Sequence, residues 1–229
     1  MNPVIPKSTF EFLSKLNQNN EREWFNENKA WYEQEHAAVI VLADAMLSSM
    51  QAHDQLQTES GKKSLMRIYR DTRFSKDKTP YKPRFAGSFS RVKPQLRGGY
   101  FFSFKPGETV VGGGFYGPNS DDLKLLRNQI AQDDEPLRKV LNDKVFKSMF
   151  GVLKGDQVKT APKGFDKEHE AIDLLRYKSM YVFREFKDQE VLSESFFDEA
   201  IKTFLALRPF FDVMTEYLTT DLNGRSIID

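Results

Sequence analysis

The chain contains no cysteine. This absence excludes disulfide bonds, thiolate zinc sites and cysteine nucleophiles, and it is consistent with a reducing compartment. Histidine is scarce as well, because the chain has only His36, His53 and His169. These residues are scattered without the spacing of metal ligands, so we expect no metal site built from histidines.

Long apolar runs are also missing. The first twenty residues hold no apolar stretch fit for a signal peptide, and no segment approaches the roughly 18 apolar residues that a membrane-spanning helix needs. We therefore expect a soluble, cytoplasmic protein with no membrane partner. No repeat, low-complexity linker or clear boundary divides the sequence, so we expect residues 1–229 to form a single domain.

Charge is distributed unevenly along the chain. Residues 62–97 contain twelve Lys or Arg against two Asp, although the whole chain has a net charge of only +1. The rest of the chain therefore carries a net charge of −9. This asymmetry favours an anionic partner for the basic part, and the alternative is a loop-rich segment whose charges are simply solvated.

The N-terminal third has the pattern of helices. Ser8 and Glu11 have the spacing of a capping box in front of an apolar run. Asn20 and Glu23 repeat this signal more weakly, and the apolar spacing after them predicts one long helix that continues to Met50.

The middle of the chain has the pattern of strands. Short aromatic or β-branched segments alternate with Gly and Pro, which predicts strands at residues 65–69, 84–89, 100–104 and 109–115. A turn is predicted at residues 105–108, and such short connections permit only an antiparallel arrangement. Glycines 112–114 lie inside a strand pattern, where they indicate a bulge or a close backbone approach.

Helices return after residues 117–120. The pattern predicts one helix that includes Leu123 and Ile130, a second that starts at residues 134–136, a short one at 171–175 and a helical segment at 195–218 that Pro209 kinks or splits. Residues 145–150 are ambiguous, and residues 177–186 are expected to form a further strand. The predicted fold class is therefore α+β, with a central antiparallel sheet flanked by N-terminal and C-terminal helices.

Residues 67–82 are the strongest candidate for a functional site. They place six cations among aromatic and hydroxyl side chains, in a segment that passes from a strand into a turn stiffened by Pro80. Guanidinium groups match the oxygens of phosphate and carboxylate in pairs, and lysines add point charges. We predict an anion-binding site formed by Arg67, Arg70, Asp71, Arg73, Ser75, Lys76, Lys78, Tyr81 and Lys82.

The same residues also permit a purely structural interpretation. The arginines could clamp the acidic N-terminal helix through its carboxylates, for which the candidates are Glu21, Glu23, Glu27 and Glu35. Asp71 lies between two arginines, so it could orient one of them, bind a metal or act as a base.

The remaining motifs carry less chemistry. Glycines 112–114 match neither the dinucleotide-binding fingerprint nor the P-loop. His169 lies in a polar stretch where it could transfer a proton or bind a metal, although a surface or capping role is the more common one.

Two motifs in order along the chain resemble a known family. The first is Asn19-Asn20-x-Arg22-x-Trp24-Phe25-x-x-x-Lys29, and the second is Arg70-Asp71-x-Arg73-Phe74-Ser75-Lys76-Asp77-Lys78-Thr79-Pro80-Tyr81-Lys82. Together with later segments at residues 112–118, 162–165 and 169–178, they resemble family 2461 of the domains of unknown function. The resemblance implies a single domain in an intracellular, mostly bacterial setting, and it implies no particular activity.

Three hypotheses for the function stay open. The first is the binding of a phosphate-bearing ligand, either an anionic small molecule or nucleic acid. The second is an enzyme that acts on a small phosphorylated or otherwise anionic substrate, with Asp71 or Tyr81 moving a proton. The third is a structural or interaction protein with a salt-bridged basic loop. The sequence specifies no cofactor.

Overall fold

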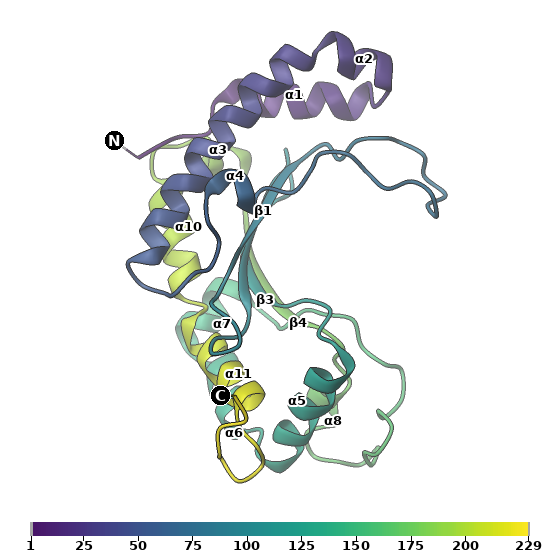
Figure 1. Cartoon of the computed structure of the whole chain (residues 1–229), viewed down its shortest axis with the longest axis vertical. Helices are drawn as coiled ribbons and strands as arrows, with labels where there is room; N and C mark the ends of the chain where they lie inside the picture. The colour runs from purple at the N-terminus through teal and green to yellow at the C-terminus, as the bar shows by residue number, and fades with distance from the viewer. Residues whose placement is uncertain (1, 229) are drawn as a thin grey trace.

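Four strands form one antiparallel sheet in the computed structural model, which describes residues 2–228 (Figure 1). The strands are β1 (Phe85–Ser90), β2 (Gly99–Phe104), β3 (Thr109–Phe115) and β4 (Met180–Phe186), in the spatial order β1-β2-β3-β4. A turn at residues 105–108 joins β2 to β3, where the amide of Glu108 donates to the carbonyl of Lys105 over 2.9 Å. The predicted α+β class is confirmed.

Helices precede, interrupt and follow the sheet. Before it lie α1 (Lys7–Gln18), α2 (Arg22–Glu27), α3 (Lys29–Gln51) and α4 (Gly61–Ser64). Between β3 and β4 lie α5 (Ser120–Gln132), α6 (Glu135–Asn142), α7 (Lys144–Phe150) and α8 (Ile172–Leu175). After β4 come α9 (Asp188–Val191), α10 (Phe196–Leu205) and α11 (Arg208–Thr219). No helix within residues 2–228 has the length and apolar character required to cross a membrane.

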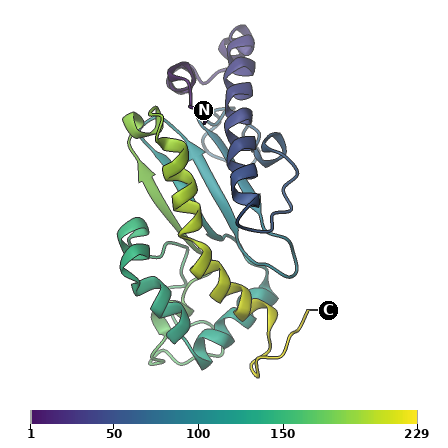
Figure 2. The same ribbon diagram turned by 90° about the vertical axis from the view of Figure 1, so that its left-hand side faces the viewer.

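One face of the sheet is covered by helices. Figure 2 shows α3, α10 and α11 lying across it. Tyr100, Phe102 and Phe104 alternate along β2, so their side chains share this face and are fully buried there. Burial of each such ring stabilises the fold by roughly 1.5–3 kcal/mol relative to an exposed ring.

The opposite face of the sheet carries half-buried aromatic side chains. Phe101 and Phe183 meet across Gly112 with ring centroids 5.5 Å apart. A Cβ atom at Gly112 would collide with the carbonyl oxygen of Val182 and with the ring of Phe183. The strand register runs without interruption through this position. Of the two features predicted for glycines 112–114, the structure therefore has the close backbone approach and not the bulge.

Two predicted helix starts are wrong. The first helix begins at Lys7 after Pro6, and no side chain caps it, so Ser8 lies inside its first turn. The predicted long helix is divided at Asn28 into α2 and α3. Asn20 does not cap α2, because its side-chain amide bonds to the backbone of Tyr81 instead.

The predicted strand at residues 65–69 is also wrong in detail. This segment makes only isolated bridges, from Leu65 to Gly87 and from Tyr69 to Tyr81. The prolines at positions 80 and 83 lack the N–H groups that a continuous ladder needs. The strand expected to start at residue 177 begins at Met180, and the ambiguous residues 145–150 belong to α7.

The C-terminal helices follow the prediction closely. The helical segment is divided before Pro209, which lies in the first turn of α11, where its missing N–H costs nothing. Asn119 caps α5 by accepting hydrogen bonds from Asp121 N and Asp122 N. The short helix expected at residues 171–175 is α8.

Candidate functional site

Residues 65–84 form an arm that extends beyond β1. Figure 1 shows its two extended segments projecting from the sheet below α1 and α2. The segments are joined by hydrogen bonds of 2.8 Å from Arg70 N to Pro80 O and from Lys82 N to Ile68 O. The arm therefore carries the predicted site residues to the periphery of the molecule.

Tyr81 fixes the arm to the N-terminal helices. The side chain of Asn20 makes two hydrogen bonds of 3.0 Å to the backbone of Tyr81, one to its N–H and one to its carbonyl. The ring of Tyr81 stacks on Phe25 at a centroid distance of 4.1 Å, and the residue is only 4% exposed. Burial raises the pKa of the Tyr81 hydroxyl. The structure thus places Tyr81 as an anchor of the arm.

Arg70 is held in position by the turn of the arm. Its guanidinium contacts the carboxylate of Asp77 and the hydroxyl of Thr79, and Ser75 Oγ lies 3.5 Å away. Asp77 in turn accepts hydrogen bonds from Thr79 N at 3.0 Å and Thr79 Oγ1 at 2.8 Å. The bonds from Arg70 and Thr79 lower the pKa of Asp77 to about 2, so this carboxylate is ionised at neutral pH.

Arg73 is paired inside the arm as well. Its Nε and Nη2 donate to the two carboxylate oxygens of Asp71 at 3.0 and 2.7 Å. This bidentate bond lowers the pKa of Asp71 and raises that of Arg73. Lys78 Nζ donates to the carbonyl of Thr72 at 3.0 Å. Asp71 therefore orients Arg73, which is one of the three roles considered for it.

The other cations of the arm have no carboxylate partner among the described residues. Arg67, Lys76 and Lys82 make no ion pair there. Burial, followed by the nearby guanidinium groups of Arg84, Arg67 and Arg70, lowers the pKa of Lys82. This concentration of charge is only partly neutralised by Asp71 and Asp77.

The alternative interpretation, in which the arginines clamp the acidic N-terminal helix, is wrong. Within residues 2–228 none of the four suggested glutamates forms an ion pair with the arm; they are Glu21, Glu23, Glu27 and Glu35. Glu35 is buried and accepts hydrogen bonds from Thr9 Oγ1 and Trp31 Nε1 instead. Neutral contacts through Asn20 and Phe25 join the helices to the arm, so the charges of the arm are not used for docking.

A hollow of about 270 Å³ lies between α2 and the arm. It is lined by Arg22, Asn26, Tyr69, Arg70, Thr72, Pro80 and Tyr81. The arginines Arg22 and Arg70, which come from different segments, therefore share one recess with Asn26 and Thr72. Such a set of donors suits an anion with several oxygen atoms.

Sequence reasoning missed Arg22 and Asn26. The spacing of Asn20 and Glu23 before α2 indicates only a helix cap. The helical spacing carried a usable signal, since residues 22, 25 and 26 share one side of a helix. Because Phe25 packs on Tyr81, Arg22 and Asn26 on the same side of α2 lie beside the arm.

The other candidates lie elsewhere. Glycines 112–114 do not line this hollow. His169 accepts a hydrogen bond at Nδ1 from Ala171 N over 3.0 Å, so it acts as a local cap before α8. Within residues 2–228 no three His, Asp or Glu side chains are grouped as metal ligands.

Comparison with known proteins gives one match. Searches of the curated proteins and of the solved structures found no similar protein. A family model described as "Conserved hypothetical protein (DUF2461)" matches residues 8–213. Because this match covers most of the 229 residues and both arm segments, the chain belongs to that family.

Proposed function

We propose that the protein binds a phosphate-bearing anion in the hollow between α2 and the arm. The observation that carries this proposal is the position of Arg70. Asp77 and Thr79 hold its guanidinium in place, while the same side chain lines a recess that it shares with Arg22. A guanidinium that is already oriented loses less conformational entropy when it binds an oxyanion.

The charge balance of the arm supports an anion with more than one negative charge. Residues 67–82 contain six cations but only Asp71 and Asp77 as acids. Both acids are already engaged by Arg73 and Arg70. The unpaired cations Arg67, Lys76 and Lys82 therefore give the arm a positive potential that attracts such an anion.

The aromatic side chains of the site indicate which phosphate-bearing ligands fit. Tyr69 lines the hollow and is about half exposed, and Phe74 at the tip of the arm is 97% exposed. Exposed rings beside cations can stack on nucleobases while the cations contact phosphate groups. A nucleotide and a single-stranded nucleic acid share this chemistry, and binding experiments separate them.

The structural hypothesis has one observation in its favour. The bidentate pair of Arg73 and Asp71 rigidifies the tip of the arm and leaves less of that guanidinium for a ligand. Arg70 is paired too, but it lines the hollow with Arg22, whereas Arg73 does not; we therefore assign Arg73 to the shape of the arm, and Arg22 and Arg70 to the ligand.

Fluorescence titration with a labelled oligothymidylate, ATP and pyrophosphate tests the proposal. Arg22→Ala and Arg70→Ala should each weaken binding by about 10- to 100-fold, since a charged hydrogen bond contributes about 1.5–3 kcal/mol. The matched control is Lys62→Ala, which removes one charge from the same basic segment, in α4, and should change binding little.

The probes and the salt concentration separate the ligand classes. Tight binding of the oligonucleotide with a steep dependence on salt indicates nucleic acid, and equal binding of ATP indicates a nucleotide. Hydrolysis of a bound phosphate ester would favour the second hypothesis, in which the protein is an enzyme. If no probe binds at low salt, or if Lys62→Ala weakens binding as much as Arg70→Ala, the proposal fails.

A further inference from the structure

The strand β4 lies at an edge of the sheet, and its outer side is paired at one point only. Lys154 N donates to Tyr181 O at 2.8 Å, and Tyr181 N donates to Lys154 O at 3.0 Å. This pairing ends where Gly151, with a φ of +70°, leads back into the C-terminal end of α7. The chain thus begins an additional strand beside β4 but does not continue it.

The rest of the outer edge is unpaired among residues 2–228. Backbone groups alternate in direction along a strand, so the N–H and C=O groups of Phe183 and Glu185 point outward, as those of Tyr181 do. They have no hydrogen-bond partner within the described chain. Free edges of this kind are ready to pair with another strand.

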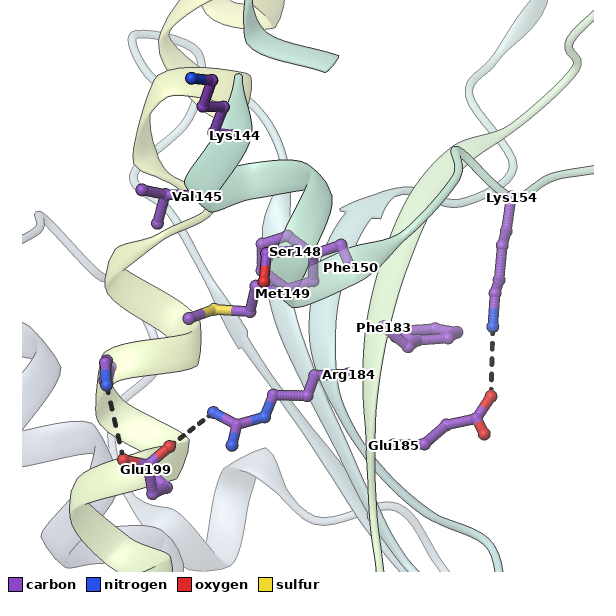
Figure 3. Close-up of a pocket in the computed structure, with 11 residues that line it drawn as sticks. Lys144, Val145, Ser148, Met149, Phe150, Lys154, Phe183, Arg184, Glu185 and Glu199 are labelled. Atoms are coloured by element: carbon purple, nitrogen blue, oxygen red, sulfur yellow. Dashed lines mark hydrogen bonds and ion pairs between the residues drawn. The ribbon is translucent and has the colours of Figure 1, made fainter. Parts of the chain in front are cut away.

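A hollow of about 810 Å³ lies against this edge. Figure 3 shows α7 and α10 on one side of β4, and the pair of Lys154 and Glu185 on the other side with Phe183. The helices contribute Lys144, Val145, Ser148, Met149, Glu199 and Lys202 to the lining. The volume is in the range of known ligand sites, and the shape is an open groove along a strand.

The two sides of the groove differ in chemistry. The helix side of the lining contributes the cations Arg184, Lys202 and Lys144 and a single acid, Glu199. Glu199 already pairs with Arg184 at 2.7 Å and with Lys202 at 3.6 Å. On the other side the ring of Phe183 is half-buried and offers an apolar surface.

We propose that the outer edge of β4 binds an extended acidic peptide, which adds to the sheet as an antiparallel strand. The peptide continues the pairing that Lys154 begins at Tyr181. Residues of the peptide opposite Phe183 and Glu185 exchange backbone hydrogen bonds with them, and their side chains lie on the side of Phe183. The residues between them direct acidic side chains toward Arg184 and Lys202.

A second copy of the chain fits this edge less well. Pairing of two β4 strands would bring the cations of both grooves close to one another, and like charges repel. An acidic peptide supplies the complementary charge and needs no symmetry. The charge of the groove thus favours the peptide.

The first test removes one backbone donor without removing a buried side chain. Glu185→Pro deletes the outward N–H, and proline is tolerated at an edge strand when that side faces away from the sheet. Glu185→Ala is the matched control, because it also loses the surface ion pair with Lys154 but keeps the N–H. Unfolding curves of both variants confirm that the fold is intact.

The probe is a short labelled peptide in which valine alternates with glutamate. We expect binding to the wild type and to Glu185→Ala, and binding weakened about tenfold in Glu185→Pro. A peptide with lysine in place of glutamate should not bind. N-methylation of the valines should abolish binding, whereas N-methylation of the glutamates should leave it unchanged, because only the valine amides face β4.

Amide hydrogen exchange tests the same edge without reference to the peptide sequence. In the free protein the amides of Phe183 and Glu185 should exchange quickly, and that of Arg184, which faces β3, should be protected. Addition of the peptide should protect the first two. Equal binding by both N-methylated peptides, or no binding by the unmodified one, overturns the proposal. Protection that rises with protein concentration alone also overturns it, because a second copy then occupies the edge.

Discussion

Arg70 and Arg91 belong to the same basic segment, yet the structure uses them in opposite ways. The guanidinium of Arg70 lies in the exposed arm, and its carboxylate partner Asp77 is seven residues away. Arg91 is completely buried and its Nε lies 2.8 Å from a carboxylate oxygen of Asp54. Its Nη2 lies 3.4 Å from Asp212, which is 121 residues away in the sequence.

The difference shows that a count of charges does not distinguish a cation that stabilises the fold from one that is free to bind a ligand. Arg91 is neutralised by Asp54 and Asp212, and Arg97 pairs with Asp122. These two arginines are part of the excess in residues 62–97 that suggested an anionic partner, but they join the connection between β1 and β2 to α5, to α11 and to the segment after α3. The cations that line the hollow are Arg70 on the arm and Arg22 on α2.

The largest effect that follows from this comparison is expected for Arg91→Met. The substitution keeps most of the volume but removes the nearest cation of the buried carboxylate of Asp54, which is left with Arg208 Nη1 at 3.7 Å. Breaking a buried ion pair in this way costs about 3–5 kcal/mol of the free energy of unfolding. Urea unfolding measures the loss.

The control for this prediction is the neighbouring exposed lysine. Lys93→Ala also removes one charge from the segment, and it should change the free energy of unfolding by less than about 0.5 kcal/mol. If Arg91→Met is as mild as Lys93→Ala, the buried network does not support the fold and the comparison fails.

A smaller loss is expected for Tyr100→Phe in the same network. The hydroxyl of Tyr100 donates to Asp54 Oδ2 at 2.6 Å. Burial, and then the bond to that carboxylate, raise the pKa of Tyr100, so the donor stays protonated at every pH at which the protein is handled. Loss of a hydrogen bond to a charged group costs about 1.5–3 kcal/mol.

Thermal or urea unfolding of a second variant sharpens this result. Tyr69→Phe removes a hydroxyl from an exposed tyrosine of the arm, which has no hydrogen-bond partner among the described residues, and should leave the stability unchanged. If Tyr69→Phe and Tyr100→Phe lower the stability equally, this would contradict the distinction between polar groups that stabilise the fold, such as Tyr100, and polar groups that remain free for a ligand, such as Tyr69.

A loss of about 1–2 kcal/mol is expected for Asn20→Ala, which removes both hydrogen bonds to the backbone of Tyr81. We expect the arm to loosen while the sheet keeps its order, so amide exchange should accelerate at Tyr81 and Lys82 and not in β2. Asn17→Ala, at an exposed position of α1, is the control. Uniform acceleration across the sheet would show that the arm is not a separate unit of stability.

Much of the fold could be predicted because its signals are local. Alternating aromatic residues and the turn at residues 105–108 sufficed for β2 and β3, and the division before Pro209 followed from its missing N–H. Where a side chain makes a long-range contact, the local sequence pattern predicts the wrong role for it. Asn20 has the pattern of a helix cap, but the side chain of Asn20 bonds to the backbone of Tyr81 instead.

The candidate site could be predicted only in part, for the same reason. The pairing of Asp71 with Arg73 lies within three residues and was among the roles considered. The hollow itself needs Arg22 from α2, and the groove at β4 combines α7, β4 and α10. No periodicity indicates that such distant segments meet.

The smallest expected effect concerns the acid partner of Arg70. Because the pKa of Asp77 is lowered to about 2, its ionised form favours the ordered arm at every pH above its ordinary value of 3.8. This contribution is lost as the pH falls from 3.8 through about 2. Carbon NMR of the side-chain carboxyl should therefore show a midpoint of about 2 in the wild type.

Arg70→Ala should move this midpoint upward, and only part of the way to 3.8, because the hydrogen bonds from Thr79 remain. Above pH 4 the occupancy of the hollow should not change with pH through Asp77, since the carboxylate that holds Arg70 is then ionised throughout. A midpoint that does not respond to Arg70→Ala would mean that Asp77 does not hold the guanidinium. Arg70 would then not be oriented in advance, and the contrast with the fixed, buried Arg91 would rest on exposure alone.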